Sequence, residues 1–333
     1  MLLSAVNNWF KFTQMSKSNY RFKVNKRLKI ASFSVLALVI IALPVFTFSS
    51  RKSELYVDAK ASGTQNGSAS HPYDSISEAI SHAKDRADIH VAKGEYKENI
   101  SLKDGIKLFG KDKEKTIIKA KKDKYATVSM KNNSTINGFT IKGGKRGIWV
   151  ENDAKASIVN CIIKDNDDDG IGIEGGNNSV VDQVSISETE IRDNGWDGIY
   201  STGPRKISIM DSEIKGNAKE GINLASGTSA WIYGNSIKEN GGTGMKLVLD
   251  QSNIWTKKND IRSNKREGVE VASYGGLGRI DISKSKIVKN GRFGIARLQR
   301  AGSANWGGSL TFGIQPELWE NYFGSISSVI YLK

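Results

Sequence analysis

The sequence predicts an all-β fold, a right-handed parallel β-helix solenoid, because three kinds of residue recur at a common spacing. Glycines that precede short apolar or alternating segments follow one another at separations of 23, 28, 23, 23, 24 and 26 residues. These repeat glycines are Gly147, Gly170, Gly198, Gly221, Gly244, Gly268 and Gly294. An asparagine stands four residues before six of them, and an isoleucine stands seven residues before the same six. A period this short has no room for a helical hairpin, so strands must build the repeat.

The alternation of apolar and polar residues within each repeat predicts strands with one buried face. Three short strands and three turns account for one repeat, and successive coils then pair at about 4.8 Å. Equivalent residues lie above one another, so the isoleucines fill the interior. The asparagines, Asn166, Asn194, Asn217, Asn240, Asn264 and Asn290, form a ladder of side-chain amides. The repeat glycines mark turns that need positive φ or a close backbone approach. The right hand follows from the general preference of parallel crossovers.

These columns resemble the repeats of the pectate-lyase-like superfamily of parallel β-helix proteins, strongly over about residues 138–300. The resemblance extends upstream through residues 55–120, which look like the entry segment of such proteins. It implies a first strand at Leu55–Asp58 and an amphipathic capping helix near Ser75–Lys84. The helix covers the open end of the stack, where unpaired strands need protection. Trp306–Lys333 departs from the repeat and is interpreted as a last irregular coil or a lid.

The N-terminal region predicts a membrane anchor. The chain carries 49 Lys and Arg against 35 Asp and Glu, a net charge of +14, and half of this excess lies in seven basic residues before residue 30. An uncharged segment, 30–48, follows and has nearly the length that crosses a bilayer. Basic residues favour the cytoplasmic side, so we expect a single-pass protein with its β-helix outside the membrane. A cleaved signal peptide, which would release the domain, is the alternative. The remaining charge is ordinary, so no nucleic-acid partner is expected.

The predicted organisation therefore has six parts. They are a basic cytoplasmic tail (1–29), a transmembrane signal-anchor (30–48), a linker (49–54), the N-terminal cap and first coils (55–130), the regular coils (131–300) and an irregular C-terminal cap (301–333). Cys161 is the single cysteine, so no intramolecular disulfide forms, and we interpret this thiol as structural.

A candidate catalytic site follows from the residue before each repeat glycine, which is often acidic. The candidate catalytic residues are Asp168, Asp169, Asp197, Glu220 and Lys246. Stacked carboxylates could hold Ca²⁺ or form an acid/base pair in which like charges raise one pKa. The plainer interpretation is turn chemistry, because acidic residues before glycine are common in turns.

A second set of residues would bind a polysaccharide. The candidate ligand-binding residues are Trp149, Trp196, Tyr200, Lys219 and Arg266. Aromatic rings stack on sugars, and cations pair with the carboxylates of a uronic polymer. No metal ligands are assigned, and no cofactor is expected unless the protein is a lyase, which would use Ca²⁺.

The resemblance implies activity on acidic polysaccharides along one exposed face. The coils, however, lack the Gly-His-Gly of polygalacturonases and the Asp-Pro-His-Asp of alginate epimerases. The sequence therefore favours an anchored protein that binds cell-surface or extracellular polysaccharide without catalysis. A polysaccharide lyase or glycoside hydrolase is the alternative, and a purely structural stalk is a third hypothesis.

Overall fold

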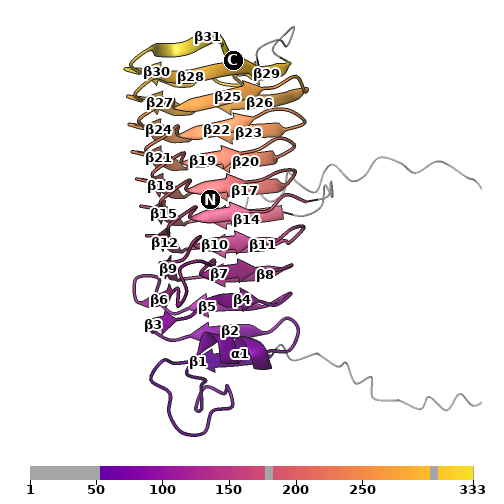
Figure 1. Cartoon of the computed structure of the whole chain (residues 1–333), viewed down its shortest axis with the longest axis vertical. Coiled ribbons are helices and arrows are strands. Elements are labelled where there is room, and N and C mark those ends of the chain that lie inside the picture. Colours follow the sequence, from indigo (N-terminus) through magenta and orange to yellow (C-terminus); the bar gives the residue numbers. More distant parts are fainter. Residues whose placement is uncertain (1–52, 177–182, 301–306, 333) are drawn as a thin grey trace, which may run out of the picture. The chain divides into compact units, whose positions relative to one another are not determined.

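A computed structural model of the protein describes residues 53–176, 183–300 and 307–332. Within these residues the strands form three parallel sheets, and each coil of chain contributes one strand to each sheet in turn (Figure 1). The coils stack in sequence order, so each strand inside the stack pairs with the equivalent strands of the preceding and following coils, and the strands at the two ends pair on one side. The predicted parallel β-helix is confirmed.

Sheet 1 consists of β1 (Glu54–Val57), β2 (Asp88–Val91), β5 (Lys107–Gly110), β8 (Ser134–Asn137), β11 (Ala156–Val159), β14 (Gln183–Ser187), β17 (Lys206–Met210), β20 (Ser229–Tyr233), β23 (Asn253–Lys257), β26 (Gly278–Ser283) and β29 (Gly308–Thr311). Sheet 2 consists of β3 (Gly94–Lys97), β6 (Thr116–Lys119), β9 (Thr140–Lys142), β12 (Ile162–Lys164), β15 (Glu190–Arg192), β18 (Glu213–Lys215), β21 (Ser236–Lys238), β24 (Asp260–Arg262), β27 (Lys286–Val288) and β30 (Glu317–Trp319). Sheet 3 consists of β4 (Ile100–Leu102), β7 (Val128–Met130), β10 (Ile148–Val150), β13 (Ile171–Ile173), β16 (Ile199–Ser201), β19 (Ile222–Leu224), β22 (Met245–Val248), β25 (Val269–Ser273), β28 (Phe293–Arg300) and β31 (Gly324–Leu332).

The interior is filled by columns of aliphatic side chains from all three sheets. The isoleucine column that the repeat predicts lies on sheet 2, and every member is fully buried. These residues are Ile163, Ile191, Ile214, Ile237, Ile261 and Ile287. Parallel pairing holds them in register, for example Ile191 with Ile214 and Ile214 with Ile237. Each coil therefore adds a layer of apolar side chains to one continuous core.

The asparagine ladder runs along the turn between sheets 2 and 3. The side-chain amide of Asn194 donates to the amide oxygen of Asn217 at 2.9 Å, and Asn217 donates to Asn240 at 3.0 Å. Each amide oxygen also accepts the backbone N–H of the asparagine one coil earlier. The ladder continues past the predicted members, because Asn290 donates to Asn321 at 2.9 Å. Buried amides thus satisfy one another from coil to coil.

The repeat glycines are required by close packing. A Cβ placed on Gly198 would lie 2.6 Å from the carbonyl oxygen of Gly221 and 2.6 Å from Cγ2 of Ile214. It would also lie 2.9 Å from Nδ2 of Asn217. None of the repeat glycines has positive φ; the left-handed residue stands instead just before each asparagine, as at Asp193 (φ 55°). Of the two roles that the sequence left open, close approach is the one the structure shows.

A second polar ladder, which the sequence did not reveal, occupies the turn between sheets 1 and 2. The N–H of Thr189 donates to Oγ of Ser212, and the N–H of Ser212 donates to Oδ1 of Asn235. Asn235 in turn donates its backbone and side-chain N–H groups to Asn259. Cys161 belongs to this column, and burial raises the pKa of its thiol to about 11. The structural interpretation of Cys161 is consistent with this position.

The predicted capping helix is α1 (Ile76–His82), which packs against β1, β2 and β4. Ser75 is its N-cap, and the Ser75 hydroxyl accepts the N–H of Glu78. The Glu98 carboxylate accepts the N–H groups of Ile76 and Ser77 at 2.9 and 2.8 Å. Ile76 and Ile80 are buried, so the helix covers the apolar interior at the first coil.

Residues 307–332 form one more coil: β29, β30 and β31 pair with β26, β27 and β28, and the last pairing has a register irregularity. The predicted tail and anchor lie outside the described residues. Among the residues that the structure does describe, no helix is both long and apolar enough to cross a membrane.

We predict that Ile214→Ala lowers the free energy of unfolding by about 2–5 kcal/mol, because it removes a fully buried side chain from a close-packed layer. Urea unfolding followed by circular dichroism measures the loss. Lys206→Ala, at an exposed position, is the control and should change stability by less than about 0.5 kcal/mol. Equal effects of the two substitutions would contradict the assigned register.

Candidate functional site

The predicted acidic column lies at the entrance to sheet 3, where each coil passes from its asparagine turn into the next strand. Parallel pairing places Asp169, Asp197 and Glu220 on successive coils, because each precedes a repeat glycine. Their side chains are buried, with only 2, 4 and 9% of their surface exposed. These side chains are therefore not exposed turn carboxylates, because the close approach of neighbouring coils covers them.

These carboxylates join one coil to the next. Oδ1 of Asp169 accepts the backbone N–H of Asp197 at 3.3 Å, and Oδ1 of Asp197 accepts that of Glu220 at 3.0 Å. Oδ2 of Asp197 accepts a hydrogen bond from the side-chain amide of Asn223 at 2.8 Å. Both oxygens of Asp197 thus have donors within the fold.

Arg146 closes the lower end of the column. Its Nε lies 3.1 Å from Oδ2 of Asp169, and its Nη2 lies 3.2 Å from Oδ2 of Asp168. The same guanidinium lies 4.8 Å from the ring centroid of Trp149. The Trp149 ring also lies against Gly172, where a Cβ would come within 2.7 Å of the ring and 2.9 Å of Cδ of Arg146. Trp149 is therefore half-buried, in contact with Arg146 and with Gly172 of the neighbouring coil.

Burial sets the protonation behaviour of the acids. It raises the pKa of Asp197 to about 7, and the hydrogen bond and negative charge of Glu220 add to this effect, whereas the Asn223 amide opposes it. Burial also raises the pKa of Asp169, against the lowering effect of Arg146. A carboxyl group that titrates near neutral pH is suited to proton transfer, although structural acids behave in the same way.

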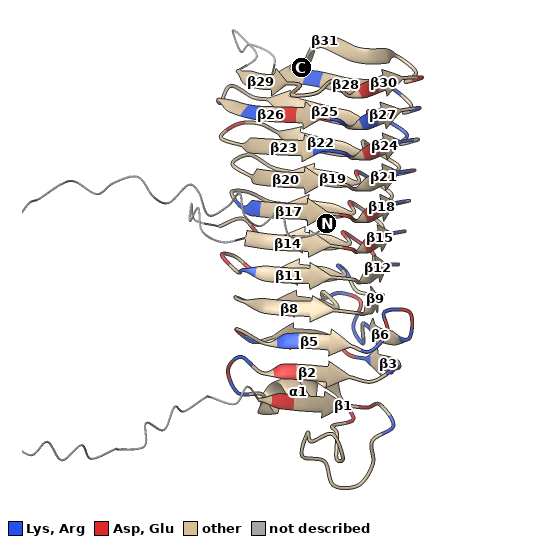
Figure 2. Ribbon diagram, turned by 180° about the vertical axis from the view of Figure 1, so that it is seen from behind, with Lys and Arg blue, Asp and Glu red and all other residues tan. Residues whose placement is uncertain are grey.

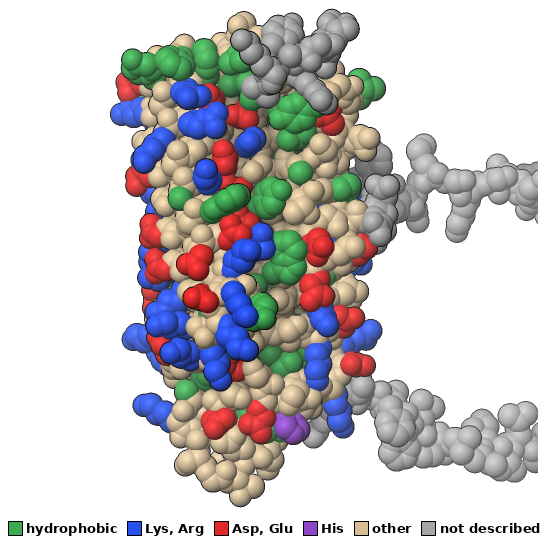
Figure 3. Space-filling view, viewed as in Figure 1, with side chains coloured by type: hydrophobic (Ala, Val, Ile, Leu, Met, Phe, Trp, Pro, Cys, Tyr) green, Lys and Arg blue, Asp and Glu red, His purple; other side chains and the backbone are tan. Residues whose placement is uncertain are grey.

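A surface depression of about 530 Å³ opens beside this column. Its lining residues are Lys145, Arg146, Asp167, Asp168, Asp169, Trp196, Asp197, Tyr200 and Asn223. Figure 3, which has the viewpoint of Figure 1, shows acidic, basic and apolar side chains intermixed on one face of the coils. Trp196 is 54% exposed, and Nζ of Lys219 lies 5.7 Å from its ring centroid. The depression thus combines aromatic surface, cations and carboxylates.

The other predicted residues lie farther along the column. Lys246 pairs in register with Asn223 on one side and with Glu270 on the other. Arg266 lies 3.5 Å from Glu267 and 3.6 Å from Glu270. Burial raises the pKa of Glu270, and the positive charges of Lys246 and Arg266 oppose this rise. The structure therefore places Lys246 and Arg266 beside a second buried acidic pair, which the sequence did not single out.

Arg146 and Asn223 line the depression although the sequence predicts no role for them. Arg146 occupies the column of the predicted acids, one residue before a repeat glycine, and Asn223 occupies the column of Tyr200 and Lys246, so register position was the available signal for both. Their function depends on side-chain contacts between coils, which a repeat pattern does not specify. Within the described residues no group of three His, Cys, Asp or Glu side chains is placed to hold a metal ion, and Asp169, Asp197 and Glu220 form none.

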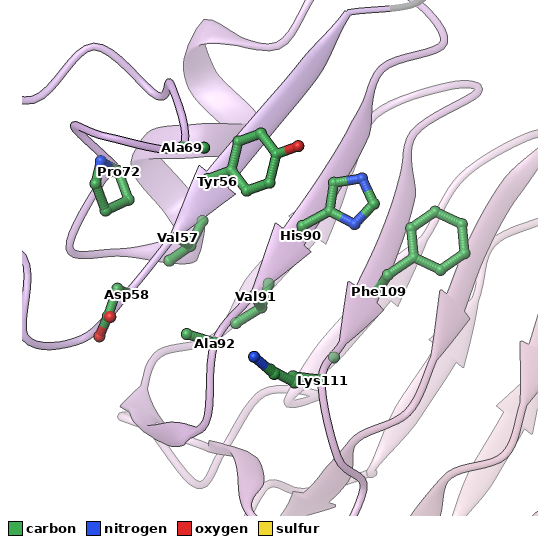
Figure 4. Close-up of a pocket in the computed structure, with 11 residues that line it drawn as sticks. Tyr56, Val57, Asp58, Ala69, Pro72, His90, Val91, Ala92, Phe109 and Lys111 are labelled. Carbon is green, nitrogen blue, oxygen red and sulfur yellow. The ribbon is translucent and has the colours of Figure 1, made fainter.

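A different cavity, of about 360 Å³, lies at the first coils on the outer face of sheet 1. The rings of Tyr56, His90 and Phe109 form a row along its floor on successive strands (Figure 4). Neighbouring centroids are 5.2 and 5.6 Å apart, with planes inclined by 25° and 19°. Asp58 is the one carboxylate in its lining, so this cavity offers fewer acids for chemistry than the depression on sheet 3.

A family model described as a right handed beta helix region matches two overlapping stretches, residues 98–235 and 146–306, which together cover more than half of the chain. The chain belongs to this right-handed β-helix family. The match also supports the predicted hand of the coils and the pectate-lyase-like resemblance. A comparison with curated protein sequences found no match.

Solved structures with the same β-helix architecture include an epimerase module, a pectate lyase and a phage tailspike domain, each with a TM-score of at least 0.50. The A-module of a mannuronan C-5 epimerase from Azotobacter vinelandii has a TM-score of 0.50 and 16% identity, with 82% of this chain and 100% of that chain covered. Pectate lyase Pel9A has a TM-score of 0.50 and 13% identity, covering 83% of this chain and 82% of that one.

The enzymatically active domain of tailspike protein 2 from bacteriophage CBA120 has a TM-score of 0.57 and 14% identity. The match covers 84% of this chain and 46% of the tailspike chain, so this β-helix spans about half of that protein. At such low identity these similarities establish the fold and leave the activity open.

We predict that Asp197→Asn flattens the pH dependence of stability. The raised pKa means that folded Asp197 holds its proton up to about pH 7, whereas the unfolded side chain loses it near its ordinary value of 3.8. Because the native state binds the additional proton in this window, the contribution of Asp197 to wild-type stability falls as pH rises from about 4 to 7, by about 1.4 kcal/mol per pH unit at most. The amide that replaces the carboxyl group in the variant has no proton to lose, so the slope should diminish.

Urea unfolding at pH 5, 6, 7 and 8 measures this slope. Glu188→Gln, on an exposed turn of the same coil, serves as the control and should keep the wild-type slope. An unchanged slope in the Asp197→Asn variant would show that this carboxyl group ionises as in the unfolded chain.

Proposed function

We propose that this β-helix binds an acidic polysaccharide in the depression on sheet 3, without catalysing a reaction on it. The observation that carries the proposal is the lining of that depression, where Trp196 and Tyr200 lie beside the cations Lys145 and Arg146. Sugar rings stack on aromatic side chains, and a guanidinium or ammonium group pairs with uronic carboxylates. The fold is shared with structures whose names denote polysaccharide-acting enzymes, which supports a polysaccharide partner.

The hydrogen bonds of the acids favour binding over catalysis. Asp169 has one oxygen on Arg146 and the other on the backbone N–H of Asp197. Asp197 likewise has one oxygen on the Glu220 N–H and the other on Asn223. Both oxygens of each carboxylate already hold parts of the fold together, which favours a structural role for these side chains over a role in catalysis. These two residues therefore support the coils that present the aromatic and cationic groups.

A lyase or hydrolase acting on an acidic polysaccharide is the second candidate, and one observation favours it. The pKa of Asp197 is raised to about 7, so this residue keeps a proton that it could donate at neutral pH. Asp168 and Glu220 would be the accompanying carboxylates, and Lys246 an additional cation. Ca²⁺ would enter only in a lyase mechanism.

We also propose that the β-helix lies outside a cell membrane and is held there by residues 30–48. The support is in the sequence, where a basic segment precedes an uncharged stretch of nearly spanning length.

We predict that Trp196→Ala weakens binding of the full-length chain to polygalacturonate or alginate by about tenfold, or about 1.4 kcal/mol. Affinity gel electrophoresis in mild detergent measures the change. Trp319→Ala is a matched control, because Trp319 is also exposed and has Nζ of Lys289 at the same 5.7 Å from its ring. Equal retardation of both variants and wild type would remove the depression from the binding surface.

The same incubations distinguish binding from catalysis. A binding protein leaves the polymer length unchanged, whereas a lyase or hydrolase produces shorter chains with new ends. Cleavage that disappears in Asp197→Asn, with binding retained, would establish the second candidate.

We predict that protease added to intact cells degrades the β-helix and leaves the basic tail protected. Immunoblotting with one tag before residue 11 and another after residue 333 follows the two parts. A mature protein that begins near Ser49 would instead establish a cleaved signal peptide.

A further inference from the structure

Two tryptophans stand side by side on the outer face of sheet 1, on a different sheet from the depression. Trp231 on β20 and Trp255 on β23 are register partners on adjacent coils. They are 44% and 38% exposed. The same register position holds Ser208 on the preceding coil and Asp281 on the following one. The β-helix therefore does not require a large ring at this position.

The rings are held in place by neighbouring side chains. Tyr233 lies nearly parallel to Trp231, with centroids 6.5 Å apart and planes inclined by 8°. Nζ of Lys258 donates to the Tyr233 hydroxyl at 2.8 Å and lies 5.3 Å from its ring centroid. The guanidinium of Arg279 lies 5.5 Å from the centroid of Trp255. The result is an ordered aromatic surface with cations along its edges.

The groups around these rings suit a sugar better than a protein partner. The strand positions beside Trp231 and Trp255 are occupied by Ser229, Asn253 and Lys257. Hydroxyl, amide and ammonium groups can hydrogen-bond to sugar hydroxyls and carboxylates. The core of a protein–protein interface is instead depleted in charged residues and rich in apolar ones.

The charged side chains around the two tryptophans indicate whether the polymer is neutral or acidic. Lys258 and Arg279 lie over the rings, and Lys257 is the register partner of Tyr233. Two acids are close by: Asp211 acts on Lys258, and Asp281 on the following coil accepts a hydrogen bond from the Thr311 hydroxyl at 2.9 Å. The strands on and next to the rings, β17, β20, β23 and β26, carry three cations, Lys206, Lys257 and Arg279, against one acid, Asp281, and Figure 2 shows the basic residues of β17 and β26 on this face. An anionic polymer matches this arrangement.

We propose that Trp231, Tyr233 and Trp255, with Lys258 and Arg279, form a second binding surface for an acidic polysaccharide. The polymer lies along the axis of the coils, because the two tryptophans are on adjacent coils. This surface has no buried carboxylate among its named contacts, so it holds the chain without reacting with it. It is independent of the depression on sheet 3, and one polymer or two can occupy the two faces.

The test compares four full-length proteins in mild detergent by affinity gel electrophoresis: wild type, Trp231→Ala/Trp255→Ala, Trp231→Phe/Trp255→Phe and Trp196→Ala. The probes are polygalacturonate and alginate, with dextran as the neutral polymer. The double alanine variant should bind the acidic probes at least roughly tenfold more weakly, and the phenylalanine variant should retain most of the affinity. Added salt should weaken wild-type binding, because the cations contribute to it.

Both substitutions face outward, so thermal unfolding by circular dichroism should match wild type. Normal acidic-polymer binding by the double alanine variant would overturn the proposal, as would a wild-type chain that no acidic probe retards. Equal binding of dextran would overturn the assignment to acidic polymers. A double variant that changes only the oligomeric state in light scattering would assign the surface to contacts between copies.

The outcome is also separable from the function proposed for sheet 3. Loss of binding in the double alanine variant with normal binding in Trp196→Ala would retain this surface and reject the depression. The converse pattern would retain the depression and reject this surface.

Discussion

The close contact between successive coils at the repeat glycines is the constraint on which the rest of the structure depends. At Gly198 the missing Cβ leaves room for the carbonyl of Gly221, the methyl group of Ile214 and the amide of Asn217. One small residue thus brings together the backbone, the apolar core and the asparagine ladder of the following coil. The same contact recurs at Gly221 and Gly244 with their own neighbours. The close contact at the repeat glycines therefore fixes how the strands pair, how the apolar layers stack and how the asparagine ladder is spaced.

The close contact between coils also explains why the carboxylates of the acidic column are buried and have raised pKa values. Asp169 and Asp197 stand directly before such glycines, so the next coil covers their side chains and supplies a backbone N–H to each. Burial then raises both pKa values. Outward strand positions have no such constraint, and there the chain places rings and cations such as Trp255 and Arg279. Packing between coils therefore determines the column before the repeat glycines, while the outward strand positions remain available for ligands.

Much of the fold could be predicted from the sequence because the repeat residues have one physical role each. The isoleucines, asparagines and glycines recur at fixed offsets, and helix α1 carries an N-cap and an apolar stripe. The polar ladder in the turn between sheets 1 and 2 could not be predicted from the repeat, because its residue type changes from coil to coil. There Thr189, Ser212 and Asn235 perform the same hydrogen bonding with different side chains. The register identified the acids, but their burial and the ring of Trp149 over Gly172 depend on contacts across coils.

The asparagine ladder has a chemical consequence for the lifetime of the protein. Three ladder members, Asn194, Asn240 and Asn290, are followed by glycine, the sequence context in which an asparagine side chain most readily cyclises onto the next backbone nitrogen and deamidates. In the folded chain each of those glycine nitrogens donates to a carbonyl of the preceding coil, at 2.8 to 2.9 Å. The nitrogen that would attack is thus occupied, and the amide that would be lost is held by its neighbours. We therefore expect deamidation at these asparagines to occur mainly in molecules whose coils have locally unfolded. Each such event leaves a carboxylate in a column built for amides, so a chain damaged while open is hindered from stacking again.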